Sequence, residues 1–146
     1  MKDDYILPAM RVREQGGILF MSGSHSQASE ISVIWVEQSL PGFHNWPDAP
    51  PERDFLAHRH RHVFRVRAEI LVRHDERDLE FFDVADRIRA WWGPGEHEFG
   101  SASCEAMARE LGLHLIRSGL PVTETSVAIS EEGGSRVIWR GISPSP

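Results

Sequence analysis

The chain has 146 residues, of which 40% are hydrophobic and 26% charged, and its formal net charge is -6 with histidine neutral. This length is that of one ordinary domain, so no second domain is expected. The acidic balance argues against a nucleic-acid-binding surface. The single cysteine, Cys104, excludes an intramolecular disulfide and a multi-cysteine zinc site.

The same features indicate a compartment. A chain with one cysteine suits a reducing cytoplasm, where disulfides are rare. No apolar run is long enough to cross a bilayer, and the polar residues Met1 to Tyr5 lack signal-peptide character. We therefore expect a cytoplasmic protein with no membrane partner.

The first half of the chain predicts strands. Residues 1–30 are interpreted as an N-terminal extension to a domain spanning 31–141, and 142–146 as a flexible tail. Ile31 to Glu37 alternates, with Ile31, Val33, Trp35 and Glu37 on one face and Ser32, Ile34 and Val36 on the other, which predicts a strand that ends at Leu40-Pro41-Gly42. A proline-rich loop follows. His62 to Arg73 and Leu79 to Phe82 then predict an antiparallel hairpin with a short charged turn.

The second half predicts two helices and a hairpin. Asp83 is expected to cap a helix that ends at Trp92, before Gly93-Pro94-Gly95. Ser103 is a favourable cap for a second helix, from Cys104 to about Ser118. The closing hairpin is predicted from the two remaining apolar stretches, Val122 to Ile129 and Arg136 to Arg140.

Three histidines at alternate positions, His58, His60 and His62, precede the long strand. If the strand begins near His60, the two-residue period places His60 and His62 on the face that carries Phe64. Two imidazoles on one face suggest a metal site, for which His44 would supply a third ligand. The same motif is also typical of solvent-facing histidines on a basic edge strand. A cupin-type site is excluded, because Glu69 falls on the opposite face.

The order of motifs resembles the 6-pyruvoyl-tetrahydropterin synthase and 6-carboxy-tetrahydropterin synthase family over roughly Ile31 to Gly141. The resemblance rests on the motifs taken together, which are Phe43-His44, His60-Arg61-His62-Val63-Phe64, Leu79-Glu80-Phe81-Phe82-Asp83, Ser103-Cys104-Glu105 and Val122-Thr123-Glu124-Thr125. It implies an α+β tunnelling fold, a four-stranded antiparallel sheet with two helices on one face. It also implies subunits that join into an oligomeric β-barrel, commonly a trimer or hexamer.

The resemblance also implies roles for individual residues. The three zinc ligands of the family fall on His44, His60 and His62, so Zn²⁺ is the expected cofactor. The glutamate that grips the pterin ring falls on Glu124, and a carboxylate is suited to this because it can accept two parallel N–H bonds. Glu105 matches a glutamate at the start of a helix, where a capping role is the simpler one. The implied partner is a small pterin or purine-derived substrate such as dihydroneopterin triphosphate.

The sequence departs from the family at its proton-transfer positions. Leu56 stands where the family has a catalytic cysteine, and a leucine cannot move a proton. Asp54 or Glu52 could replace it after a shift of the loop, and His97 is offered where the family has an aspartate and histidine between its helices. Cys104, in the first turn of a helix, is either an activated thiol or, more simply, a buried one.

Two hypotheses follow for the function. The first is a zinc-dependent lyase of pterin or 7-deazaguanine precursor metabolism that uses an altered acid and base. The second is a catalytically silent relative that keeps the fold, and with it the metal, as a binding or assembly module. His58 stays open as an alternative ligand, if the register of the strand slips by two residues. Arg59 and Arg61 are candidates to face a triphosphate.

Overall fold

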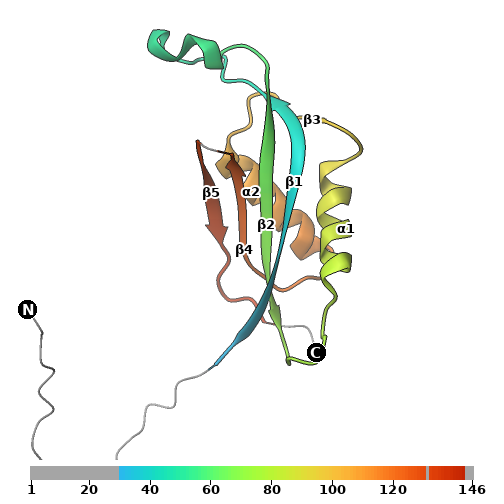
Figure 1. Ribbon diagram of the computed structural model, residues 1–146. Helices are drawn as coiled ribbons and strands as arrows, with labels where there is room; N and C mark the ends of the chain where they lie inside the picture. Colours follow the sequence, from blue (N-terminus) through green and yellow to red (C-terminus); the bar gives the residue numbers. More distant parts are fainter. Residues whose placement is uncertain (1–29, 131, 144–146) are drawn as a thin grey trace, which may run out of the picture.

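The computed structural model describes residues 30–130 and 132–143, so the predicted N-terminal extension lies almost wholly outside the described residues. The helices and strands are, in chain order, β1 (Ser32–His44), the 3-10 helix η1 (Pro51–Leu56), β2 (His60–Val72), α1 (Phe81–Trp92), β3 (His97–Glu98), α2 (Cys104–Arg117), β4 (Val122–Ile129) and β5 (Gly133–Ile138). This content confirms the expected α+β class (Figure 1).

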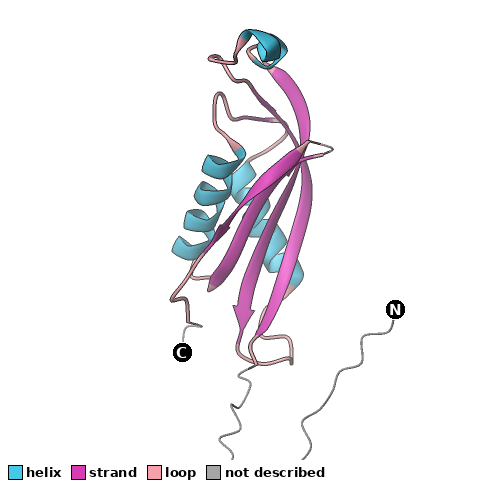
Figure 2. Cartoon of the chain, turned by 90° about the vertical axis from the view of Figure 1, so that its left-hand side faces the viewer, coloured by secondary structure: helices cyan, strands magenta, loops and turns pink. Residues whose placement is uncertain are grey.

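One mixed sheet has the strand order β3-β1-β2-β4-β5. The pairs β1–β2, β2–β4 and β4–β5 are antiparallel, whereas β3 runs parallel to β1 over two residues. The sheet therefore has five strands in place of the four antiparallel strands expected. Figure 2 shows both helices on one side of this sheet.

The two-residue period of β2 builds the core. Phe64, Val66, Ala68 and Ile70 are fully buried on the side of the helices, while the residues between them face outward. The helices close this layer with side chains at helical spacing, which are Val84, Ala85, Ile88 and Trp92 from α1 and Met107, Ala108, Leu111 and Leu115 from α2. Burial of such apolar side chains is the main stabilising contribution to the fold.

The predicted hairpin between His62–Arg73 and Leu79–Phe82 is wrong. Both edges of β2 are occupied by β1 and β4, so no edge remains for a further strand. The chain instead enters α1 at Phe81, and the side chains of Phe81 and Phe82 are 59% and 77% exposed. The N-cap residue of α1 is Glu80, so the prediction that Asp83 caps this helix is wrong. Asp83 lies in the first helical turn, where the helix dipole favours its negative charge.

The predicted end of the first strand is also wrong, because β1 continues through Pro41 and Gly42 to His44. The indole Nε1 of Trp92 donates a hydrogen bond to the carbonyl oxygen of Pro41, at 3.2 Å. A Cβ atom added to Gly42 would lie 2.9 Å from the Trp92 ring and 3.0 Å from the carbonyl oxygen of His97. Glycine at position 42 thus allows α1 and β3 to approach β1 closely, and β1 continues to the end of the sheet where His44 lies.

Ser103 caps α2 as predicted, since its hydroxyl accepts a hydrogen bond from the backbone N–H of Ala106 at 3.2 Å. This cap fixes where α2 begins and therefore where Cys104 and Glu105 lie. Among the described residues, no helix combines the length and the apolar character that a membrane span requires.

Candidate metal centre

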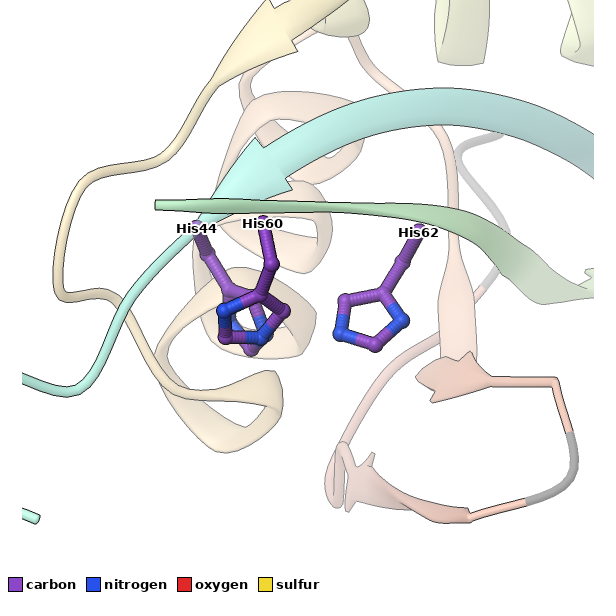
Figure 3. Close-up of side chains that lie close together, drawn as sticks. All are labelled: His44, His60 and His62. Atoms are coloured by element: carbon purple, nitrogen blue, oxygen red, sulfur yellow. The ribbon is translucent and has the colours of Figure 1, made fainter. Parts of the chain in front are cut away.

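The three histidines predicted as ligands converge at one end of the sheet (Figure 3). His44 is the last residue of β1 and pairs directly with His60, the first residue of β2. His62 lies two residues further along β2, on the same face. One ligand atom from each of the three side chains lies within 4.8 Å of the others. Strand register alone therefore assembles a triad that could bind a metal ion.

The three rings form a compact triangle. Their centroids are separated by 4.7 Å between His44 and His60, 4.9 Å between His44 and His62, and 4.8 Å between His60 and His62. Below them lies the ring of Phe64, which is fully buried and stands edge-on to His44 and His62 at 5.6 and 5.7 Å. An apolar floor of this kind limits solvent access to the site and holds the rings in place.

Two ring nitrogens of this cluster are buried without a hydrogen-bond partner among the described residues, Nε2 of His60 and Nε2 of His62. Buried polar atoms in folded proteins are almost always satisfied, so such a pair indicates a missing partner. The other nitrogen of His60, Nδ1, lies 2.6 Å from the carbonyl oxygen of His58. A backbone acceptor on Nδ1 is the usual arrangement for a histidine that binds a metal through Nε2.

His58 contributes to the site through this carbonyl group. Its ring is not part of the histidine cluster, so the open alternative in which His58 is a ligand finds no support in the strand register.

Burial and repulsion between neighbouring rings lower the pKa of His44 and of His62 and so favour their neutral forms. Burial lowers the pKa of His44, and the charges that His60 and His62 would carry lower it further. Burial also lowers the pKa of His62, against the opposing effect of Glu132, whose Oε1 lies 4.0 Å from Nδ1 of His62. Neutral imidazole is the form that binds a metal.

A cavity of about 470 Å³ opens beside His44 and His60. Its remaining lining comes from five segments of the chain, which are Asn45 and Trp46, Leu56, Ser101 to Glu105, Ile129, and Glu132 to Ser135. Leu56, at the position where the resemblance would place a cysteine, faces the cavity. A reacting group bound here would lie next to the histidine triad.

Hydrogen bonds close the base of the loop that brings Trp46 and Leu56 to the cavity. The backbone N–H of Trp46 donates to the carbonyl oxygen of Leu56 at 2.7 Å, and the Asn45 side chain donates to the carbonyl oxygen of Ala57 at 3.3 Å. The Asn45 backbone N–H also donates to the carbonyl oxygen of Gly100, at 2.8 Å. These bonds fix both cavity walls relative to His44.

Glu105, which the resemblance matches to a glutamate at the start of a helix, lies at the cavity. Hydrogen bonds from its own backbone N–H and from the hydroxyls of Ser103 and Ser135 lower its pKa. The carboxylate is thus charged and held at the N-terminus of α2. Cys104 also faces the cavity, but burial and the nearby Glu105 and Glu132 raise its pKa, so the thiol form is favoured and an activated thiolate is not.

Three other predicted site residues lie away from the cavity lining. Glu124 is on β4, opposite Glu69 and Ile138, and its Oε2 accepts from Arg136 at 3.5 Å. Asp54 is an exposed residue of η1.

His97, the third of them, is in β3, where its ring packs 4.4 Å from that of Phe99. Within one chain, the structure does not bring Glu124, Asp54 or His97 to the histidine triad.

Trp46 and Glu132 both line the cavity and are among its residues that had no assigned role in the sequence analysis. Glu132 lies in the connection between β4 and β5, for which the sequence analysis predicted only that it joins the two strands of the closing hairpin. The pairing of Phe64 with Ile129 brings this connection to the same end of the sheet as His62. A correct strand order would therefore have identified it, and Trp46 follows from its position two residues after His44.

Comparison with known proteins gives the fold a single kind of support. No protein-family model matches the chain, and no curated protein matches it. Among solved structures, the crystal structure of an uncharacterized protein from Wolinella succinogenes is similar, with a TM-score of 0.54 and 15% sequence identity. The match covers 75% of this chain and 99% of that chain. At this identity the likeness concerns the fold alone.

Proposed function

We propose that this chain is a zinc-dependent enzyme that acts on a pterin or a related purine-derived compound. One observation carries the proposal: His44, His60 and His62 present their ring nitrogens to one another beside a cavity, and two of these nitrogens are buried without a partner. Structural zinc sites usually have four protein ligands, whereas catalytic sites have three and an open position. Three histidines next to a cavity fit the catalytic pattern.

The donor set favours zinc over other ions. Imidazole suits zinc, and the cluster contains no carboxylate or carbonyl oxygen of the kind that magnesium and calcium prefer. Bound zinc would supply a Lewis acid next to the cavity. The low pKa values of His44 and His62 leave both rings ready to bind the ion near neutral pH.

The cavity offers two kinds of contact to a flat nitrogen-rich ring. The carboxylates of Glu105 and Glu132 are acceptors for ring N–H and amino groups. Trp46 and Leu56 supply apolar walls, and the Trp46 side chain remains 47% exposed, so its surface is free to stack on a ligand. Pterins combine a flat aromatic ring with an amino-pyrimidinone edge, which requires both kinds of contact.

We also propose the tunnelling fold, with assembly into a trimer or hexamer. The outer edge of β1 is covered by β3 only at Gly42 and Phe43, and β5 ends the sheet on the other side. Open edges of this kind can pair with another subunit. The sheet face opposite the helices also exposes Trp35 and Ile138, at 55% and 56%. Light scattering after size exclusion tests this proposal, and a monomer at micromolar concentration would refute it.

The test of the enzyme proposal has two parts. The purified protein should contain about one zinc per chain, and the zinc-loaded protein should convert dihydroneopterin triphosphate or a related purine-derived compound. His60→Ala should remove both properties. A zinc-loaded protein that binds pterin and leaves every such compound unchanged would exclude the lyase assignment.

A second candidate function, a catalytically silent module with the same fold, is favoured by Leu56. This leucine faces the cavity where the resemblance expects a proton-transfer cysteine. In that case His60→Ala would change thermal stability or oligomeric state and no chemical rate. A folded His60→Ala variant that loses a measurable activity would reject this candidate.

A further inference from the structure

The cavity beside the histidine triad has an acidic lining. Among the described residues that form it, Glu105 and Glu132 are the charged side chains, and none is lysine or arginine. The other polar lining groups are neutral, namely Asn45 and the serines at 101, 103 and 135. Binding of a phosphate group in proteins normally relies on arginine or lysine, or on free backbone N–H groups.

The N-terminus of α2, where backbone N–H groups could bind a phosphate, is already occupied by a carboxylate. The N-terminus of α2 borders the cavity at Ser103 and Cys104. The carboxylate of Glu105 is held there by its own backbone N–H and by the hydroxyls of Ser103 and Ser135. A carboxylate at a helix N-terminus takes the position of an anionic ligand and repels a second one.

The loop arginines do not supply the missing positive charge. Nε and Nη2 of Arg59 donate to Glu98, and its guanidinium group lies 3.4 Å from the centre of the Phe43 ring. Nε of Arg61 donates to Glu96 at 2.6 Å. Neither arginine lines the cavity. The expectation that Arg59 and Arg61 face a triphosphate therefore has no support in the structure.

We infer that this site takes a phosphate-free heterocycle, an uncharged or cationic flat ring, in preference to the triphosphate ester of the same ring. The inference rests on the proposed function and narrows its substrate class. A divalent ion on three neutral histidines brings two positive charges, which Glu105 and Glu132 balance. A phosphate-free ring keeps this balance, whereas a triphosphate adds several negative charges with no partner among the cavity-lining residues described.

A ring-matched pair of ligands tests the inference. Zinc-saturated protein is titrated with neopterin and with neopterin triphosphate, followed by calorimetry, with inorganic triphosphate as a control for removal of zinc by the phosphates. We expect the phosphate-free ring to bind on the order of tenfold more tightly than its triphosphate. Glu105→Gln and Glu132→Gln should each reduce this ratio, mainly through tighter binding of the triphosphate. Glu110→Gln, an exposed position on α2 outside the cavity lining, should leave the ratio unchanged.

The outcomes separate the inference from the function on which it depends. Tighter binding of neopterin triphosphate would overturn the inference while supporting the proposed function. A ratio that is unaffected in both glutamine variants would also overturn it, because the discrimination would then have another origin. If neither ring binds zinc-loaded protein that is shown to be folded by circular dichroism, both the proposed function and the inference fail.

Discussion

His44 and His60 are directly paired residues of the β1–β2 ladder, and their ring centroids lie 4.7 Å apart. The site is therefore set by strand register. A slip of one residue would turn His60 and His62 to the opposite face of the sheet, where Arg61 and Val63 now lie. The thirteen residue pairs that join β1 and β2 hold this register along the whole length of both strands.

The first prediction concerns metal binding. His60→Ala removes one of three ligands, so zinc affinity should fall by more than the roughly 10–100-fold typical of losing an outer-shell partner. Competition with a chromophoric chelator measures the affinity. His58→Ala is the matched control, because only the backbone carbonyl of His58 contacts the site and this group is retained. Equal losses in both variants would contradict the assignment of ligands.

The second prediction concerns Trp46. Stacking of a ring on this side chain should contribute about 1–3 kcal/mol to ligand binding, as base–aromatic stacking does elsewhere. Trp46→Ala should therefore weaken neopterin binding on the order of tenfold, while Trp46→Phe should retain most of the affinity. Trp35→Ala serves as the control, since Trp35 is exposed on the outward face of β1. Equal affinity of the Ala and Phe variants would show that Trp46 does not contact the ring.

The third prediction concerns a buried hydrogen-bond chain. The fully buried hydroxyl of Thr125 donates to the carbonyl oxygen of Ala108 at 2.7 Å and accepts from Nε1 of Trp139 at 3.1 Å. Thr125→Val removes the second hydrogen bond of the Ala108 carbonyl, which lies within α2, and leaves the indole N–H of Trp139 without this acceptor, so the free energy of unfolding should fall by about 1–3 kcal/mol. Urea unfolding measures it. Thr125→Ser, which keeps the hydroxyl, should lose less, and an equal loss in both variants would assign the effect to packing.

The fourth prediction concerns pH. Hydrogen bonds from the side chain and the backbone N–H of Arg73 lower the pKa of Asp78 from 3.8 to about 2. A depressed carboxyl pKa adds stability that is present above about pH 4 and is lost as the pH falls towards 2. Asp78→Asn should thus be less stable than the natural chain at pH 7, and the difference should shrink between pH 4 and 2.

Urea unfolding at several pH values checks the fourth prediction. Asp48→Asn, at an exposed position between β1 and η1, is the control, because Asp48 has no hydrogen bond or ion pair with an arginine among the described residues. A difference for Asp78→Asn that stays constant down to pH 2 would contradict the assigned role of Arg73.

The sequence was sufficient to predict structure where a local residue pattern coincides with a buried face. The alternation along β2 predicted both the buried Phe64 side and the shared face of His60 and His62, and Ser103 predicted the start of α2. The triad followed because its ligands flank one loop between paired strands. These features depend on hydrophobic periodicity and helix capping, which are determined by residues close together in the sequence.

The sequence was insufficient to predict the bounds and pairing of strands where tertiary contacts override the local pattern. Pro41 and Gly42 read as a strand end, yet contacts with Trp92 and β3 carry β1 through them. Leu79 to Phe82 reads as a strand, but β2 has no free edge to pair with it. The role of Glu132 depends on which strands are neighbours, because only the β2–β4 pairing brings its turn beside His62.

The backbone hydrogen bond between Trp46 and Leu56 closes the loop that joins β1 to β2 and separates residues 47–55, the excursion, from the candidate metal centre. Residues 47–55 start and finish at the hydrogen bond between Trp46 and Leu56, and Figure 1 shows η1 projecting beyond the end of the sheet. Because His44 and His60 are fixed by strand pairing below this bond, the length of the excursion is uncoupled from the ligand geometry. This segment is therefore the natural place to insert a tag or a new recognition loop without disturbing the three histidines.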